Sequence, residues 1–491
     1  MRFIHLVLTV TLVAPCALAQ TTASPAPVSP ETRAAVSRLI GDIMVNGRAY
    51  DYDRLLADGI GPRLTGSDNY VHAVSWAQDQ FHTLGLTNIH TESFTMAALW
   101  EPETPATGHI IEPRNQTLHI YSAGWSPSTP DGGITGKVVY IPQLLPLEKL
   151  DAMKDKLAGN IALVDSNSFG EHAAIGDLIS AFTRLGTFTP QAVLLTGHAN
   201  GTENAGSLAI GGGLSKFPVA QIGLEDELLI KRFLEKVPVT VQFSFKNRVR
   251  PATEVNNVVA EIRGRDLPNE IVIVGAHLDS WHPGTGAQDN GTGVATVLEV
   301  ARAIKSLNRP PRRTIRFILF GGEEEGLIGS TAYAKKHAAD MASIDAVLIS
   351  DTGAQPSRGW YLMGREDEKE SMAPIEPLLS GLGAANTSPD TQFLFETDHA
   401  GFDVQGVPTL VLWNGVDKYF RLHHQASDSF DSVVQADLNQ GVAVTAATAY
   451  AIADSAQPFA PHLDSAGVEM MLKKAGELDN YIALKSMDWV P

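Results

Sequence analysis

A short, strongly apolar run at residues 271–276 limits the folds that this chain can adopt. Four consecutive β-branched residues, isoleucine and valine in alternation, are followed by glycine and alanine. A strand that is apolar at every position, rather than at every second one, is typical of a sheet covered on both faces. Beyond the next loop, residues 294–304 have the apolar period of a helix. We therefore expect a buried strand and a covering helix here.

The same alternation of strand and helix continues through the second half of the chain. Helical segments separate most of the apolar runs that we interpret as strands, which are residues 258–262, 271–275, 314–320, 346–350 and 409–413. Alternating strands and helices favour an α/β fold with a mainly parallel, helix-covered sheet.

The first half of the chain has a different texture. Residues 31 to about 58 and residues 70–84 have helical periodicity. From about residue 118 to 248, short β-type runs alternate with glycine-rich turns and few long helices; the runs are residues 138–141, 161–164, 192–195 and 239–243. This pattern indicates a separate β-rich module inserted into the α/β unit.

These features divide the chain into six expected segments. They are a signal peptide at 1–19, a flexible leader at 20–30, a first segment of the α/β domain at 31–120, the inserted module at 121–250, a second segment of the α/β domain at 251–456, and a C-terminal tail at 457–491.

Composition and the N-terminal residues indicate the cellular compartment of the protein and exclude one class of partner. The chain of 491 residues carries 37 basic and 55 acidic residues, a formal charge of -18 that argues against nucleic-acid binding. Residues 1–19 have the pattern of a secretory signal, and their apolar run is too short to span a membrane. The single cysteine, Cys16, would leave with that signal. We expect a secreted or periplasmic protein with no disulfide bond and no membrane anchor.

Carboxylates and histidines follow several of the predicted strands. His277 comes directly after the run at 271–276, three glutamates at 323–325 follow the next strand, and Asp351 follows another. Asp289 lies in the glycine-rich loop after His277, and a pair of histidines at 423–424 lies in a polar loop. Singly, each could be a cap or a surface residue. In parallel sheets, however, the carboxyl ends of the strands meet at one edge, where ligands bind.

The combined set has the chemistry of a two-metal site. His277, Asp289, one or two of the glutamates 323–325, Asp351, and either His423 or His424 are the donors that two zinc ions sharing a carboxylate require. A water or hydroxide shared by the two ions becomes nucleophilic near neutral pH. A neighbouring glutamate can then take its proton and pass it to a leaving amine.

At this point the sequence resembles the M28 family of metallopeptidases. The stretches that carry the resemblance are residues 61–67, 277–280, 286–293, 323–330, 350–351, 397–402, 406–408 and 424–428. The inserted module resembles a protease-associated domain.

The resemblance implies a role for each site residue. His277 and Asp351 would bind one zinc, Glu324 and His424 would bind the other, and Asp289 would bridge them. Glu323 would be the general base, and Asp279 would hydrogen-bond to His277 and set its tautomer. The bond after the bridging aspartate would be cis. The resemblance assigns no role to Glu325 or His423.

The function expected from these features is an exported dizinc exopeptidase that cleaves dipeptides or short peptides. A broad-specificity aminopeptidase is the alternative, and a non-catalytic binding ectodomain on the same fold is a weaker one. Other divalent ions could replace zinc in such a ligand set. The chain could also pair with a second copy of itself.

Overall fold

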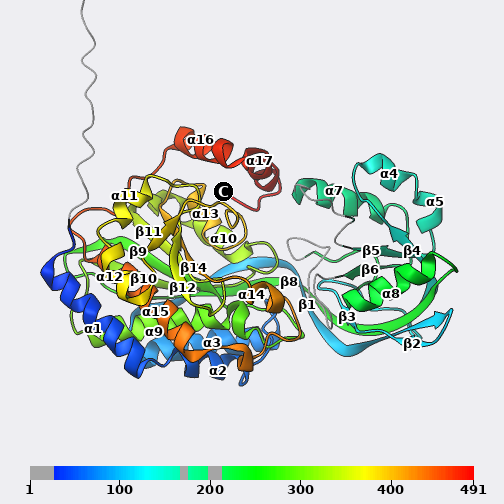
Figure 1. Ribbon diagram of the computed structural model, residues 1–491, viewed down its shortest axis with the longest axis horizontal. Coiled ribbons are helices and arrows are strands. Elements are labelled where there is room, and N and C mark those ends of the chain that lie inside the picture. The colour runs from blue at the N-terminus through cyan, green and yellow to red at the C-terminus, as the bar shows by residue number, and fades with distance from the viewer. Residues whose placement is uncertain (1–26, 166–167, 169–174, 197–212) are drawn as a thin grey trace, which may run out of the picture.

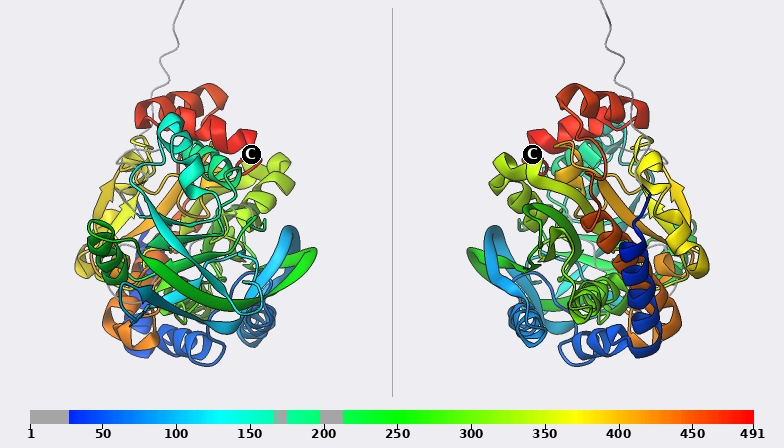
Figure 2. Two further views of the ribbon diagram at one scale, coloured as in Figure 1. Left: turned by 90° about the vertical axis from the view of Figure 1, so that its right-hand side faces the viewer. Right: turned by 90° about the vertical axis from the view of Figure 1, so that its left-hand side faces the viewer.

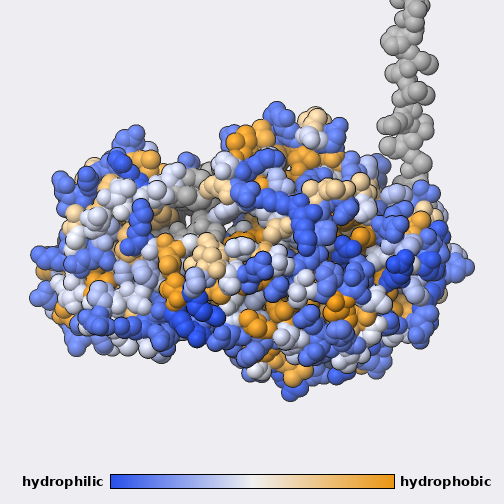
Figure 3. All heavy atoms as spheres, turned by 180° about the vertical axis from the view of Figure 1, so that it is seen from behind, coloured by the Kyte–Doolittle hydropathy of each residue, from blue (hydrophilic) through white to orange (hydrophobic). Residues whose placement is uncertain are grey.

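The computed structural model describes residues 27–165, 168, 175–196 and 213–491. The expected signal peptide and most of the expected leader lie outside these residues. Two lobes are joined by a long two-stranded ribbon, with the larger lobe on the left in Figure 1. On the face seen in Figure 3, apolar side chains are interspersed among hydrophilic ones.

The larger lobe contains the helix-covered sheet that the sequence predicts. Its strands, in spatial order, are β13 (Asn386–Ser388), β12 (Ser357–Tyr361), β14 (Thr409–Asn414), β11 (Ile344–Ile349), β9 (Leu267–His277), β10 (Arg313–Phe320) and β8 (Thr240–Ile262). The four strands β14, β11, β9 and β10 are mutually parallel, whereas β8 and β12 pair with them in antiparallel fashion. The mainly parallel sheet is confirmed.

Strand β9 shows why its sequence is apolar throughout. Val272 and Val274 belong to the core on one face of the sheet, and Ile271 and Ile273 belong to the core on the other. Successive side chains of a strand point to opposite faces, so a doubly covered strand needs apolar residues at every position.

Helices cover both faces of this sheet. One layer contains α1 (Pro30–Asn46), α2 (Ala49–Ala57), α3 (Asp68–Thr83), α9 (Thr292–Ser306) and α15 (Gln435–Ala453). The opposite side carries α10 (Ile328–Lys336), α13 (Ala400–Asp403), α16 (Ser465–Ala475) and α17 (Leu478–Ser486). Figure 2 shows α16 and α17 on the opposite side of the lobe from α2 and α3. Further short helices are α11 (Glu368–Met372), α12 (Glu376–Leu379) and α14 (Tyr419–Leu422).

The prediction of a single helix from residue 31 to 58 is wrong in one respect, because the structure has two helices there. Gly47 leaves the helical conformation with φ -59° and ψ 140°, and α2 begins two residues later. Periodicity did not reveal the break because both helices bury apolar residues in the same core, among them Leu39 and Ile43 of α1 and Leu56 of α2. Ser29 caps α1 by accepting a hydrogen bond from the Thr32 amide at 3.0 Å, and Pro30 occupies the first helical turn.

The ribbon between the lobes consists of β1 (Thr87–Glu112) and β8, which pair antiparallel from Thr87 opposite Glu261 to Glu112 opposite Thr240. The strands expected at 239–243 and 258–262 are therefore two ends of one strand. Consequently the boundary expected at residue 250 lies within β8, a continuous element that belongs to both lobes.

The smaller lobe is a second sheet with helices. Its strands are β2 (Gln116–Thr117), β3 (Ile120–Ser122), β4 (Ile134–Ile141), β5 (Ile161–Val164), β6 (Ala192–Thr196) and β7 (Val219–Ile222). Strands β4 to β7 are parallel in sequence order, and β4 joins the ribbon by pairing with β8. Its helices are α4 (Leu147–Asp151), α5 (Lys154–Leu157), α7 (Ile175–Gly186) and α8 (Leu224–Leu234).

Within the described residues, no helix is long and apolar enough to cross a membrane.

Candidate active site

The predicted site residues converge on one edge of the larger sheet. His277 is the last residue of β9, Glu323 follows the end of β10 by three residues, and Asp351 follows the end of β11 by two. These strands are parallel neighbours, so their carboxyl ends lie side by side. His423 and His424 come from the loop that follows α14, and α14 follows β14 in the sequence.

The imidazole of His277 is buried among carboxylates. Its Nδ1 lies 3.1 Å from the main-chain carbonyl oxygen of Asp279, and a carbonyl oxygen can only accept, so Nδ1 carries a proton. Its Nε2 lies 3.1 Å from Asp351 Oδ1 and 3.3 Å from Asp289 Oδ1. Burial alone would lower the pKa of His277, but the carboxylates of Asp351 and Glu323 raise it well above its usual value.

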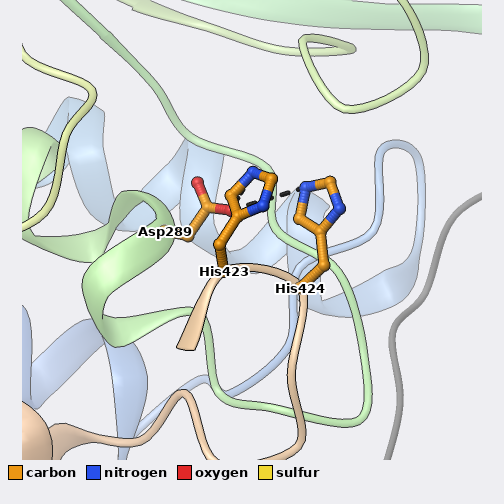
Figure 4. Close-up of side chains that lie close together, drawn as sticks. All are labelled: Asp289, His423 and His424. Carbon is orange, nitrogen blue, oxygen red and sulfur yellow. Dashed lines mark ion pairs between the residues drawn. The ribbon is translucent and has the colours of Figure 1, made fainter. Parts of the chain in front are cut away.

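A second group forms around His424. Its Nε2 lies 2.9 Å from Glu324 Oε2 and 3.6 Å from Asp289 Oδ2. Asp289 therefore turns one oxygen toward His277 and the other toward His424. Figure 4 shows Asp289 beside His423 and His424, whose rings are stacked with centroids 3.7 Å apart.

This donor set fits a pair of divalent cations. In the neutral ring of His277, the Nε2 lone pair faces two carboxylate oxygens, which is favourable only when a cation or a proton lies between them. Asp289 Oδ2 and Glu324 Oε1 are buried acceptors without a hydrogen-bond partner in the described part of the chain. Ligand atoms lie within 4.8 Å of one another in three overlapping groups, which are Asp289 with His423 and His424, His277 with Glu323 and Asp351, and His277 with Asp289 and Glu324. Buried acceptors that crowd in this way are normally neutralised by a metal.

The glutamate triplet divides into three environments. Glu323 Oε2 lies 4.0 Å from His277 Nε2, whereas Glu324 lies against His424. Glu325 is buried, with Asp279 and Thr65 as neighbours. Burial raises the pKa of Glu323 and Glu324 well above the usual range, and the carboxylates around them raise it further.

Asp279 contacts His277 as expected, but its main-chain carbonyl rather than its carboxylate makes the hydrogen bond. Its carboxylate Oδ1 is 3.7 Å from His277 Nδ1, and the closer partner of that nitrogen is the Asp279 main-chain carbonyl. The other carboxylate oxygen accepts a hydrogen bond from the Glu324 amide at 3.2 Å. Asp279 thus connects the loop after β9 with the loop after β10.

The loop that carries Asp289 has an irregular backbone. The Asp289–Asn290 peptide bond is cis, which confirms the expectation for this bond. The Asn290 side-chain amide donates to the Ser350 carbonyl oxygen at 2.8 Å, which anchors the loop next to Asp351. Helix α9 begins directly afterwards at Thr292.

Sequence reasoning missed several residues around this cluster. Asp428, in the loop after His424, accepts hydrogen bonds from the amides of Gln288 and Asp289, and Trp281 lies edge-on to His424 with ring centroids 6.2 Å apart. Arg63, in the Gly/Pro loop of residues 61–67, reaches the loop after β9. The motif resemblance covered both loops, but no pattern in the sequence shows which backbone groups these side chains contact.

The fold and the cluster together define a class of metal-dependent hydrolases with an α/β sheet. Comparisons with known proteins identify the class further. Residues 257–449 match peptidase family M28. Carboxypeptidase Q from Bos taurus is 30% identical over 439 residues, which cover 85% of this chain and 89% of the relative. The human carboxypeptidase Q is 29% identical over the same shares.

Solved structures agree with this match. A peptidase M28 precursor from Shewanella amazonensis superposes with a TM-score of 0.76 at 27% identity, covering 88% of this chain and 99% of that one. A zinc aminopeptidase from Bacillus subtilis has the same fold, with a TM-score of 0.64 at 22% identity over 85% of this chain and 98% of that one. The chain belongs to peptidase family M28 and is a metallo-exopeptidase.

Proposed function

We propose that this chain is an exported dizinc exopeptidase that hydrolyses dipeptides or short peptides. The observation that carries the proposal is the position of Asp289, whose two carboxylate oxygens face His277 and His424 separately. In this proposal His277 and Asp351 would hold one ion, Glu324 and His424 would hold the other, and Asp289 would be shared by both. The bound ions would supply Lewis-acid activation of water and of the scissile carbonyl group.

The side chains of the protein perform the proton transfers. Glu323 acts as the general base, because its carboxylate borders the cluster but lies farther from His277 Nε2, at 4.0 Å, than Asp351 and Asp289 do. A carboxylate at this position can take a proton from water and return it to the leaving amine. The carbonyl of Asp279 holds the proton of His277 on Nδ1, and this leaves Nε2 available as a ligand.

The exopeptidase activity rests on the relatives named carboxypeptidase Q, whose matches cover 85% of this chain and 89% of each relative. The preference for short substrates rests on the smaller lobe. We interpret the smaller lobe as a protease-associated-like domain that limits access by long polypeptides. Its proximity to the site supports this role, because Trp125, just after β3, lies edge-on to Trp281 with ring centroids 6.1 Å apart. Export rests on the signal-like residues 1–19.

An aminopeptidase is the alternative within the same class. An aminopeptidase from Pseudomonas aeruginosa is 34% identical over 202 residues, which cover 40% of this chain and 31% of the relative. Both activities use the same metal ligands, so the terminus of the substrate that is recognised distinguishes them.

A comparison of three substrates tests the proposal. The purified protein with added zinc is given a free dipeptide, the same dipeptide N-acetylated, and the same dipeptide C-amidated, and the products are followed by mass spectrometry. Cleavage of the free dipeptide alone is expected. Cleavage that survives amidation but not acetylation would establish an aminopeptidase. If a chelator has no effect on cleavage, or if none of the three is cleaved, the metallopeptidase proposal is wrong.

A further inference from the structure

Two side chains outside the loop between His277 and Asp289 form hydrogen bonds with its backbone: Arg63 donates to its carbonyl groups, and Asp428 accepts from its amides. We propose that Arg63 and Asp428 are positioning residues that hold this loop in its metal-binding conformation before any metal binds. The inference rests on the ligand set proposed above. It adds that two side chains fix the position of Asp289, the proposed bridging ligand, before metal binds.

Arg63 satisfies carbonyl groups at both ends of the loop. Its side chain is fully buried, and Nε donates to the Leu278 carbonyl at 2.9 Å. Nη1 donates to the Thr285 carbonyl at 2.8 Å, and Nη2 donates to the Gly286 carbonyl at 3.0 Å. One guanidinium thus joins the residue after His277 to a residue three positions before Asp289.

The backbone of Arg63 adds to the same contact. The Arg63 amide donates to Ser280 Oγ at 3.0 Å, and the Ser280 amide donates to the Arg63 carbonyl at 3.3 Å. The remaining contact of the guanidinium is from Nη1 to the Gly61 carbonyl at 3.0 Å, within the loop of residues 61–67. The side chain is therefore fixed at its base as well as at its tip.

Asp428 satisfies amide groups of the same loop. Its carboxylate oxygens accept from the Gln288 amide at 2.7 Å and from the Asp289 amide at 3.1 Å. Its carbonyl oxygen accepts from the Thr285 amide at 2.7 Å. Because Asp428 is only four residues beyond His424, it ties the bridging aspartate to the loop that supplies a ligand of the second ion.

The approach of these two loops leaves no space for a side chain at Gly284. A Cβ atom there would lie 2.4 Å from the Gln425 carbonyl oxygen and 3.0 Å from the Asp428 carbonyl oxygen. The contact between the Asp289 loop and the His424 loop is therefore one of packed backbones.

Arginine is suited to this place for a specific reason. Its planar guanidinium presents five donors in a fixed fork, whereas lysine presents three donors from a single nitrogen. Four of the five donors are used here, all on carbonyl oxygens. Burial disfavours its charged form, and the carboxylates of Asp53, Asp428 and Asp279 favour it. A lysine would keep the charge but could not bond all four carbonyl groups.

Hydrogen exchange tests the claim on the unaltered protein. The amides of residues 285–289 are followed by mass spectrometry in the zinc-loaded protein and in protein freed of metal with a chelator. If the two side chains hold the loop, these amides exchange at least about 100-fold more slowly than in an unstructured chain even without metal. Free exchange of this loop in the metal-free protein, or unfolding of the whole chain on chelation, would overturn the inference.

Substitution supplies the second test. Arg63→Lys removes the fork, and Asp428→Asn replaces one of the two acceptor oxygens with a donor. Each is expected to weaken zinc binding by about 10- to 100-fold, to alter the absorption spectrum of the cobalt-substituted protein, and to lower kcat more than it raises KM. Arg313→Lys is the matched control. Arg313 is equally buried, but it pairs with Glu270 and Asp345 at the opposite end of β10, so its substitution is expected to leave metal binding and spectrum unchanged.

The outcomes separate this inference from the proposed function. If the folded Arg63 and Asp428 variants bind zinc as the wild type does and give the same cobalt spectrum, neither residue positions the loop. If neither variant folds, the exchange result on the wild type decides. A wild type that binds no zinc while its loop is protected would refute the proposed function and leave the positioning role standing.

Discussion

Glu323 and Glu324 are adjacent and chemically identical, yet the structure gives them different neighbours. The Glu324 carboxylate lies 2.9 Å from His424, whereas the Glu323 carboxylate lies 4.0 Å from His277. We therefore expect Glu323→Gln to keep its metal and to lose turnover by about 100-fold or more, because general base help is removed. Activity and zinc content of the same sample are the measurements.

The neighbouring substitution serves as the control for this prediction. Glu324→Gln changes size and charge by the same amount, and it is expected to lose bound zinc. Loss of metal from Glu323→Gln instead would make Glu323 a ligand, an arrangement that its grouping with His277 and Asp351 would allow.

The choice between His423 and His424 shows what spacing could and could not predict at the scale of residues. Residues 424–428 carry the motif resemblance, which favours His424, and His424 is the one that contacts Glu324. However, His423 Nε2 also lies 3.6 Å from Asp289 Oδ2, the same distance as His424 Nε2. Two adjacent histidines in a loop can both face the same carboxylate. The path of the backbone after α14 determines which of the two also contacts Glu324.

At the scale of elements, the buried strands were predictable and the ribbon was not. The run at 271–276 lies within β9 as predicted, because burial on both faces demands a continuous apolar stretch. Strand β1 gave no such signal. It contains Pro102 and Pro105, and its pairing with β8 is irregular between Pro102 and Thr107. In a sequence, proline argues against a strand. Strand β1 forms nevertheless, because β8 pairs with it along its length.

The helix α13 provides a pH-dependent prediction. His399, at its N-terminal cap, is fully buried, and neither ring nitrogen has a hydrogen-bond partner within the described residues. Burial lowers the pKa of His399 to about 3, whereas an unfolded histidine titrates near about 6.5. Between about pH 6.5 and pH 3, the unfolded chain therefore binds a proton at this histidine and the folded chain does not. Stability from this group is complete above about pH 6.5 and is lost as the pH falls toward 3.

The matching variant is His399→Gln, which cannot take up that proton. As the pH falls, the unfolding free energy of the wild type is expected to decrease by up to about 1.4 kcal/mol per pH unit because of this group. Relative to that of the variant, it should therefore fall by about 2 kcal/mol from pH 6.5 to pH 4.5. Urea unfolding of both proteins without metal measures it. Parallel pH profiles would show that His399 is not kept neutral by the fold.

At the scale of the whole molecule, the ribbon determines how the smaller lobe can be removed. Thr104 of β1 lies opposite Lys246 of β8, so residues 105–245 can be replaced by a two-residue Asn-Gly turn that closes a hairpin. If the lobe limits substrate length, the ratio of tetrapeptide to dipeptide turnover should rise by at least about tenfold, or about 1.4 kcal/mol in relative barrier.

Two checks accompany that measurement. Zinc content and cooperative unfolding must match those of the full chain, since the cut also removes Trp125 and its contacts with Trp100 and Trp281. An unchanged ratio in a variant that passes both checks would exclude the lobe as a limit on substrate length.

The sequence alone determined the class of this protein. Apolar runs that can be buried only in a covered sheet specified the fold, and donor residues placed directly after those runs specified a metal-dependent hydrolase, because both signals are local in the chain. The tertiary structure decided everything that depends on distant partners. These features include the continuity of β8 across two lobes, the separate neighbours of Glu323 and Glu324, and the contact of Arg63 with a loop more than two hundred residues away. Such contacts depend on how strands and loops pack, and packing brings together residues that no local pattern relates.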